Sequence, residues 1–312
     1  VSDSAFDVSA ALERRLKALR VRIVRDRAVS LEIADGTVRG VAGERGSYPA
    51  DGVILATGGV SYPGTGSTGD GHRLAAEAGH TVTPLRGSLV PLQGVIAPGI
   101  PCVRLQGLSL RNIGLTVFEN NKKLYTDFGE LLFTHFGVSG PLILSASAHM
   151  RYFDKKQYRL EIDLKPALDE QQLDKRLLSD FGKYANHDFQ NALDDLLPQK
   201  LIPVVVQLAE IPGRQKVHDL TREQRQSLLR VLKHFPVEIS APCPVEDAIV
   251  TSGGVKVSEI DPKSMESKLV KQLHFAGELI DTDAYTGGFN LQIAWATGRL
   301  AGQSAACARN NR

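Results

Sequence analysis

The chain has 312 residues, of which 42% are hydrophobic and 23% charged, an ordinary composition for a globular protein of about two domains. Its formal net charge is +2, which predicts neither nucleic acid nor an anionic membrane as a partner. The three cysteines are far apart and form no CxxC motif, so neither a disulfide framework nor a metal site is predicted. No apolar run reaches the roughly 18 residues of a membrane helix. We therefore expect a cytoplasmic protein.

The N-terminal part alternates between helical and strand patterns. Apolar residues at helical spacing predict an amphipathic helix over 5–19. Strand patterns follow over 21–24, over 28–42 as a hairpin turning at Ala34-Asp-Gly36, and over 46–49 as an edge. The short apolar run 53–56 predicts a central strand buried on both faces.

A glycine-rich stretch over 59–71 follows that strand. Gly64 to Gly69 spell GxGxxG, but Val60 to Pro63 separate them from the strand, and no acidic residue follows about 20 positions on. A dinucleotide fingerprint needs both features. We instead predict a ligand-facing loop that enters a helix over 73–78, with Ser67 or Thr68 as N-cap. His72 fits a capping or surface position better than a catalytic one.

The middle of the chain has a different pattern of predicted secondary structure. Short strand patterns separated by Gly and Asn turns occur at 88–92, 109–118, 123–126 and 130–134. Such a series of short strands predicts a barrel or folded sheet. A helix is expected over 139–150 and a strand over 158–164. Charged helical patterns then run over 169–181, 191–197, 202–208 and 221–235, the last opened by a Thr221–Gln224 capping box. Strand patterns return at 236–239 and 248–250.

This order predicts an inserted domain. Helices and strands alternate at both ends of the chain, whereas the segment between them has a run of strands followed by a run of helices. We therefore expect one discontinuous domain made of 1–83 and 251–312. The inserted domain would span 84–250, with its helical portion at about 167–235.

The C-terminal stretch over 273–302 contains a short buried strand and an acidic turn within 273–281, then the pair Gly287–Gly288 and a helix rich in small residues. The free N–H groups and the dipole of a helix N-terminus favour negative charge. Gly287 and Gly288 would let a ligand approach the backbone. An ordinary helix that starts after glycine and packs on a sheet would have the same residues. The motif alone therefore does not decide between a ligand site and a packed helix.

Taken together, the motifs resemble the YhiN/BaiN-like flavoproteins, also described as aminoacetone oxidase family enzymes, a branch of the NAD(P)/FAD-dependent oxidoreductases. The matching segments span nearly the whole chain in order: Val53–Gly59, Ser61–Pro63, Thr65–Gly71, Ser88–Leu92, Glu130–Pro141, Thr251–Val255, Ser267–Lys268, Phe275–Asp281 and Thr286–Asn290. The resemblance implies an α/β fold in which a Rossmann-like FAD-binding domain is interrupted by a β-barrel-like domain with a helical subdomain.

The resemblance also implies how FAD would bind. The turn of Ala56, Thr57, Gly58 and Gly59 would pass its pyrophosphate and adenosine side. Gly277, Glu278 and Asp281 would lie near the ribityl chain and pyrophosphate, although both carboxylates also fit a solvated loop. Gly287, Gly288, Phe289 and Asn290 would offer backbone N–H groups to the pyrimidine edge of the flavin. A positive helix end there stabilises an anionic reduced flavin.

One departure from the family concerns the start of the chain. The family opens with a βαβ unit whose GxGxxG holds the ADP half of FAD, and no such unit precedes Val1. We therefore expect a truncated chain, a fragment of a longer protein that alone binds FAD weakly or not at all.

The function expected from the resemblance is hydride or electron transfer between a small organic substrate and the flavin, with NAD(P)H as a candidate donor. The substrate would lie where the two domains meet, near Ser61, Thr134 and His135. Tyr62 or Tyr285 could donate a proton, or could serve only in packing. Two alternatives stay open: a non-catalytic remnant or binding module, and a flavin-dependent RNA-modifying enzyme, against which the near-neutral charge argues.

Overall fold

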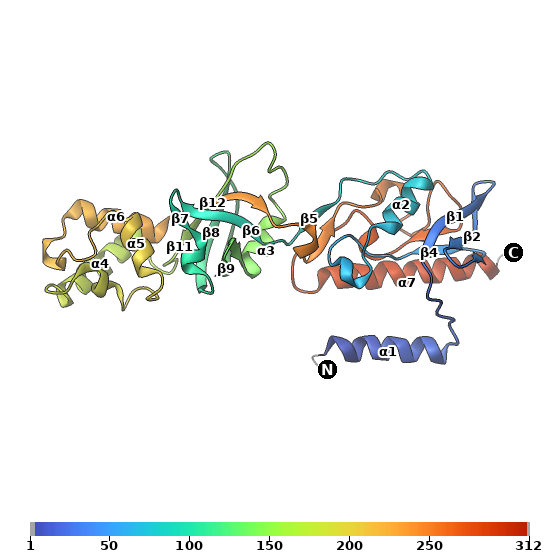
Figure 1. The fold of residues 1–312 in the computed structure, drawn as a ribbon, viewed down its shortest axis with the longest axis horizontal. Coiled ribbons are helices and arrows are strands. Elements are labelled where there is room, and N and C mark those ends of the chain that lie inside the picture. Colours follow the sequence, from blue (N-terminus) through green and yellow to red (C-terminus); the bar gives the residue numbers. More distant parts are fainter. Residues whose placement is uncertain (1–3, 311–312) are drawn as a thin grey trace.

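The computed structural model describes residues 4–310, with the side chains of 4–307. The molecule is elongated (Figure 1): elements from both ends of the chain form one half, a β-barrel lies in the middle, and a group of helices forms the far end. We refer to the part built from α1, β1–β4, α2, β14 and α7 as the terminal half.

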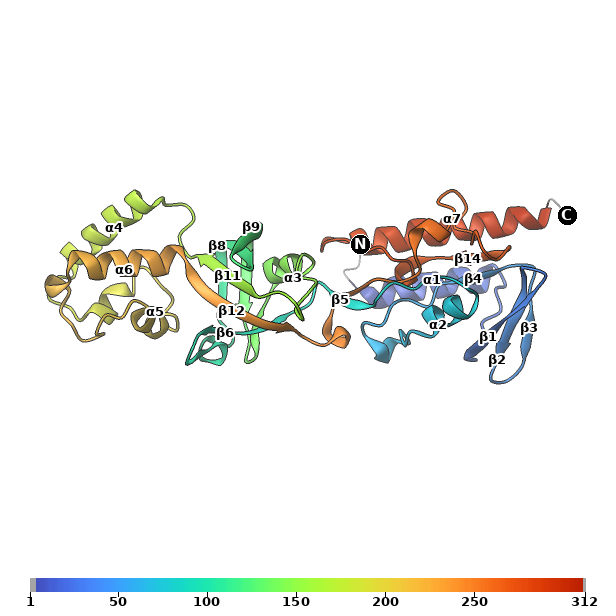
Figure 2. The ribbon, with the colours of Figure 1, turned by 90° about the horizontal axis from the view of Figure 1, so that it is seen from above.

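The terminal half contains two small sheets. Its elements are α1 (Ala5–Ala18), β1 (Ala28–Ala34), β2 (Thr37–Gly43), β3 (Ser47–Pro49), β4 (Val53–Leu55), α2 (Asp70–Glu77), β14 (Leu273–Phe275) and α7 (Phe289–Asn310). The strands β1, β2 and β3 form an antiparallel sheet, and β4 pairs in parallel with β14. Helix α7 runs along the β4–β14 pair, and the three-stranded sheet stands at its outer end (Figure 2). The 28–42 hairpin and the edge position of β3 are confirmed.

Two strand predictions in this half are wrong. Residues 21–24 form no strand, and Val21 and Ile23 are 48% and 60% exposed, because none of the described strands pairs with them. The strand β4 is not buried on both faces: Ile54 is 38% exposed, whereas Val53 and Leu55, whose side chains point to the opposite face, are buried. The amphipathic helix α1 forms as predicted, but it buries no residue and lies apart from the rest of this half (Figure 1).

Helix α2 begins differently from the prediction. It starts at Asp70 behind Gly69, which has a φ of 84° and replaces Ser67 or Thr68 as N-cap. The Thr68 hydroxyl instead donates to the Asp70 carboxylate at 3.1 Å. Arg27 binds the same carboxylate with two hydrogen bonds of 2.9 Å. The negative charge at the helix N-terminus is therefore supplied from inside the first turn.

The central sheet closes into a barrel, as the sequence predicted. Its strands are β6 (Leu92–Ala97), β7 (Ile100–Pro101), β8 (Ser109–Glu119), β9 (Lys122–Phe133), β10 (Gly137–Ser139), β11 (Tyr158–Asp163) and β12 (Phe235–Pro242). The order is β10-β9-β8-β11-β12-β6-β7, and β10 also pairs with β6. That pairing closes a ring of six strands. The patterns at 123–126 and 130–134 belong to one strand, β9, and helix α3 (Pro141–Ser147) packs against it.

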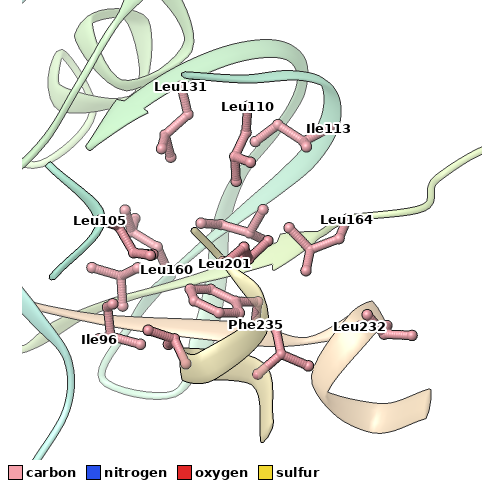
Figure 3. Close-up of a cluster of buried hydrophobic side chains, with 14 of the residues drawn as sticks. Ile96, Leu105, Leu110, Ile113, Leu131, Leu160, Leu164, Leu201, Leu232 and Phe235 are labelled. Atoms are coloured by element: carbon pink, nitrogen blue, oxygen red, sulfur yellow. The ribbon is translucent and has the colours of Figure 1, made fainter. Parts of the chain in front are cut away.

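Helices close one end of the barrel: α4 (Glu170–Lys183), α5 (Ile202–Leu208) and α6 (Arg222–Lys233). The capping box is confirmed, with Gln224 N–H donating to Thr221 Oγ1 at 3.2 Å and Thr221 N–H donating to Gln224 Oε1 at 3.0 Å. The helix expected over 191–197 is a short 3₁₀ turn, Phe189–Leu193. Leu201 and Leu232 lie against Phe235 and Leu160 in one continuous core (Figure 3).

The chain passes between the terminal half and the barrel twice. The two passages, β5 (Arg86–Ser88) and β13 (Val250–Ser252), pair antiparallel. We propose that this ribbon marks the boundary between the discontinuous domain 1–83 and 251–312 and the inserted domain 84–250. Within residues 4–310, no helix has both the length and the apolar character needed to cross a membrane.

Candidate functional site at the domain junction

A cavity of about 350 Å³ opens where the β5–β13 ribbon meets the N-terminus of α7. One wall comes from the ribbon, the other from the loop before α7 and from its first two turns. The lining is mostly aliphatic, with a few polar groups: Leu89, Ile249, Val250, Glu278, Thr282, Tyr285, Thr286, Gly287, Gly288, Asn290, Leu291, Ile293 and Ala294. Apolar walls with a few fixed polar groups are typical of cofactor and small-molecule sites.

The first turn of α7 is open toward this cavity. Gly287 and Gly288 have φ values of 108° and 89°, and a Cβ at Gly288 would meet no atom within 4 Å. The Asn290 side chain does not cap the helix. Its Oδ1 accepts from Ala284 N–H at 2.8 Å, and its Nδ2 donates to the Ala284 carbonyl at 2.7 Å. The helix therefore presents N–H groups that lack intrahelical acceptors, together with the positive end of its dipole.

Glu278 connects three segments beside the cavity. Its Oε1 accepts from Thr251 N–H at 2.6 Å and from the Ser61 hydroxyl at 3.1 Å. Gly59 packs closely against Thr251 and Glu278, because a Cβ at this position would stand 2.1 Å from Thr251 Oγ1 and 2.6 Å from Glu278 Oε1. The turn after β4, the strand β13 and the turn after β14 thus meet at one carboxylate.

The predicted cofactor residues fall into two groups. Glu278, Gly287, Gly288 and Asn290 line the cavity. The others lie around it or away from it. Gly59 contacts Glu278, and the Thr57 hydroxyl lies against Gly71 at the start of α2. Gly277 N–H donates to Thr297 Oγ1 at 3.0 Å, and Asp281 N–H donates to the Val255 carbonyl at 3.0 Å. Ala56 is exposed, Gly58 partly buried, and Phe289 is 59% exposed.

The predicted substrate-side residues are also divided. Tyr285 lines the cavity, whereas Tyr62 is 49% exposed and does not. Ser61 is buried and faces Glu278. Thr134 accepts from Gly137 N–H in the turn after β9, and the His135 ring packs on Phe136. Neither of these two residues lines the cavity.

Two residues that the sequence did not indicate lie next to Tyr285 on the barrel side, one in contact with its hydroxyl and the other behind the first. His149, just after α3, contacts the Tyr285 hydroxyl through Nε2 at 2.8 Å. Tyr125 of β9 stacks on the His149 ring with centroids 4.4 Å apart. Burial, followed by the charge of Arg151, lowers the pKa of His149. No motif joins these residues, because their proximity depends on how the barrel sits on the terminal half.

His72 is a buried histidine whose pKa is affected first by burial and then by the charge of Glu278. Neither ring nitrogen of His72 has a hydrogen-bond partner among the described residues. Burial lowers the pKa of His72, and the charge of Glu278 and the Leu279 backbone offset part of this effect. His72 is therefore neutral at pH 7, and it is neither the cap nor the surface residue that the sequence favoured.

The parallel β4–β14 pair, the glycine turns and the open helix end define the terminal half as a dinucleotide-fold unit with a barrel inserted in it. The chain belongs to the HI0933-like protein Rossmann domain family, whose match covers residues 1–304. This confirms the predicted Rossmann-like fold and the family resemblance.

Three relatives are similar to this chain over most of its length. It is 33% identical to the 3-dehydro-bile acid delta(4,6)-reductase of Clostridium scindens, over 98% of this chain and 74% of that protein. It is 30% identical to the ribosomal RNA dihydrouridine synthase of Escherichia coli, over 83% of this chain and 62% of that protein. The synthase of the same name from Haemophilus influenzae is also 30% identical, over 78% of this chain and 58% of that protein.

Proposed function

We propose that this chain acts as an FAD-dependent oxidoreductase that transfers hydride between a small organic substrate and the flavin, with NAD(P)H as electron donor. The observation that carries the proposal is the open N-terminus of α7, which faces a largely aliphatic cavity beside Glu278. Membership of a Rossmann family and similarity to a named reductase support it.

The residues present fit a flavin. An aliphatic cavity suits the faces of a planar ring system, and the two glycines leave room for it at the helix end. Backbone N–H groups of Gly287, Gly288, Phe289 and Asn290 would face the electron-rich pyrimidine edge. Glu278, Gly277 and Asp281 would lie toward the ribityl chain, and the turn of Ala56, Thr57, Gly58 and Gly59 toward the pyrophosphate. A bound flavin supplies the hydride chemistry, and the protein supplies position and charge.

The names of the relatives suggest the substrate class. A delta-reductase and a dihydrouridine synthase both add hydrogen to a carbon–carbon double bond. In both named substrate types that bond is conjugated to a carbonyl group. We propose the same bond as the target here. The formal charge of +2 gives no support for RNA as the substrate.

The first test is a visible absorption spectrum of the chain mixed with FAD and then desalted. The proposal expects retained flavin bands that bleach on anaerobic addition of NADH or NADPH. This result would also overturn the expectation from the sequence that the chain alone binds FAD weakly or not at all. Flavin that is retained but not bleached by either nucleotide would indicate a binding module. Absence of bound flavin would contradict the proposal for this chain.

A matched pair of variants locates the flavin. Leu291 lines the cavity and is 65% exposed, so Leu291→Asp places a carboxylate beside the proposed pyrimidine edge without burying it. Leu269 is 50% exposed and does not line the cavity, so Leu269→Asp is the control. The proposal expects weaker FAD binding for Leu291→Asp and unchanged binding for Leu269→Asp. Equal affinity in both variants would place the flavin elsewhere.

A further inference from the structure

The phenol of Tyr285 joins the cavity to the barrel. Tyr285 lines the cavity from the loop before α7. Its hydroxyl lies 2.8 Å from Nε2 of His149, which is 136 positions away in the sequence. A Tyr–His pair at hydrogen-bond distance, in which the tyrosine lines a cavity, has the geometry of a general acid that can be reprotonated.

The imidazole of His149 is held in place by its stacking partner. The Tyr125 ring stacks on it at a centroid distance of 4.4 Å and an interplanar angle of 25°. The Tyr125 hydroxyl donates to Asp127 at 2.6 Å, which fixes that ring in turn. Burial, followed by the Asp127 hydrogen bond, raises the pKa of Tyr125. Tyr125 therefore remains a neutral phenol and acts as a support.

The loop that carries Tyr285 is fixed at two further points. The Ser88 hydroxyl, at the end of β5, donates to the Asp283 carboxylate at 2.7 Å. Asn290 binds both backbone groups of Ala284. Because the residues on both sides are held, the phenol has a defined position between the cavity and His149.

We propose that Tyr285 donates a proton to the substrate in this cavity and that His149 passes a proton from solvent to restore the phenol. This inference rests on the proposed function, and it makes Tyr285 the catalytic residue and Tyr125 a positioning residue. Tyr62, the other candidate from the sequence, does not line the cavity and has no part in this step.

The step balances with a reduced flavin as the source of electrons. Reduction of a double bond conjugated to a carbonyl requires a hydride at one carbon, which the reduced flavin supplies, and a proton at the other. The Tyr285 O–H bond breaks as the new C–H bond forms. The phenolate then takes the proton from His149 Nε2, while Nδ1 takes one from water. A neutral imidazole can do this because one nitrogen donates as the other accepts.

Several charged and titratable groups lie near the Tyr285–His149 pair. Arg151 follows His149 and lowers its pKa, secondary to burial. Tyr125 and Asp127 approach from β9, Asp283 from the loop, and Glu278 lines the same cavity as Tyr285. A lowered pKa keeps His149 neutral at pH 7, the form that can relay a proton.

The test separates the two half-reactions of the FAD-loaded chain. NADPH or NADH first bleaches the flavin, and cyclohexenone, a small ring with a double bond conjugated to a carbonyl, then reoxidises it. Tyr285→Phe should leave bleaching unchanged and slow reoxidation about a hundredfold, the usual order for a lost general acid. Tyr152→Phe, a tyrosine of similar exposure that does not line the cavity, should change neither rate. Tyr62→Phe should behave like Tyr152→Phe.

His149 is tested by chemical rescue. His149→Ala should slow reoxidation, and added imidazole should restore it by stacking on Tyr125. Slow reoxidation without rescue would assign His149 a structural role and overturn the relay. Unchanged reoxidation in Tyr285→Phe, or slowing in Tyr62→Phe alone, would overturn the assignment of the donor.

A second readout needs no flavin. In the NMR spectrum of the chain alone, Tyr285→Phe should shift the His149 Nε2 resonance, whereas Tyr152→Phe should not. If wild-type flavin is bleached but never reoxidised by the enone, the proposed substrate class fails and the proton-donor role fails with it. If wild type turns over and Tyr285→Phe equals it, only the proton-donor inference fails.

Discussion

The carboxylate of Glu278 accepts a hydrogen bond of 2.6 Å from the backbone N–H of Thr251. Thr251 is 1% exposed, so no water replaces this acceptor if it is removed. The bond joins the turn after β14 to strand β13, and the Ser61 hydroxyl adds the turn after β4 to the same oxygen. One carboxylate thus organises the wall of the proposed flavin site, which makes it a structural residue as well as a candidate ligand.

Replacing Glu278 by Ala should destabilise the chain by about 1–3 kcal/mol, because the buried Thr251 N–H loses its acceptor. Glu278→Gln should lose less, since its amide oxygen can take the same position. Urea unfolding of the three proteins measures the difference. If the Ala variant is as stable as wild type, the bond contributes nothing to stability.

Gly59→Ala should also destabilise the chain, by about 1–3 kcal/mol, the usual cost of forcing an extra methyl group into a packed site. The new Cβ would stand 2.1 Å from Thr251 Oγ1. Gly64→Ala is the control, because a Cβ at Gly64 meets nothing within 4 Å. Thermal unfolding should show a lower midpoint for Gly59→Ala alone, and equal midpoints would contradict the close packing at this turn.

The stability of the chain should fall as the pH falls through the ordinary pKa of histidine, about 6.5. Burial lowers the pKa values of His72 and His80 in the folded state, so the unfolded chain binds protons first and gains stability relative to the fold. His72→Leu removes one of these groups and should flatten the pH dependence between neutral pH and the folded-state pKa. Melting temperatures measured across this range would show an unchanged slope if His72 does not contribute.

Phe133→Ala should destabilise the barrel by about 3–5 kcal/mol, the usual cost of emptying a buried aromatic site. Phe133 is fully buried and meets Phe235 edge-on at 6.3 Å. Phe128 lies on the same strand, β9, but is 59% exposed, so Phe128→Ala is the matched control. Denaturant unfolding should separate the two variants clearly, and similar losses would mean that this core is poorly packed.

The sequence by itself determined the elements whose hydrogen bonds are local. Asp35 and Gly36 both have positive φ, as expected for an Asp-Gly hairpin turn. The Thr221 capping box joins residues three apart, and α5 occupies the predicted residues Ile202–Leu208. The order of strand and helical patterns along the chain also predicted the barrel and the helices that follow it. In each case the information lies within one turn or one period of the chain.

Only the tertiary structure decided the contacts between distant segments. A strand pattern at 21–24 does not become a strand without a neighbour to pair with, and the side chain of Ile54 in β4 stays 38% exposed although β4 pairs with β14. The closure of β10 onto β6 brings Val138 to Leu92, and the docking of the barrel brings His149 to Tyr285. Strand register and side-chain contacts across many residues depend on the whole packed fold, because no local pattern specifies which distant partner a strand edge or a ring nitrogen will meet.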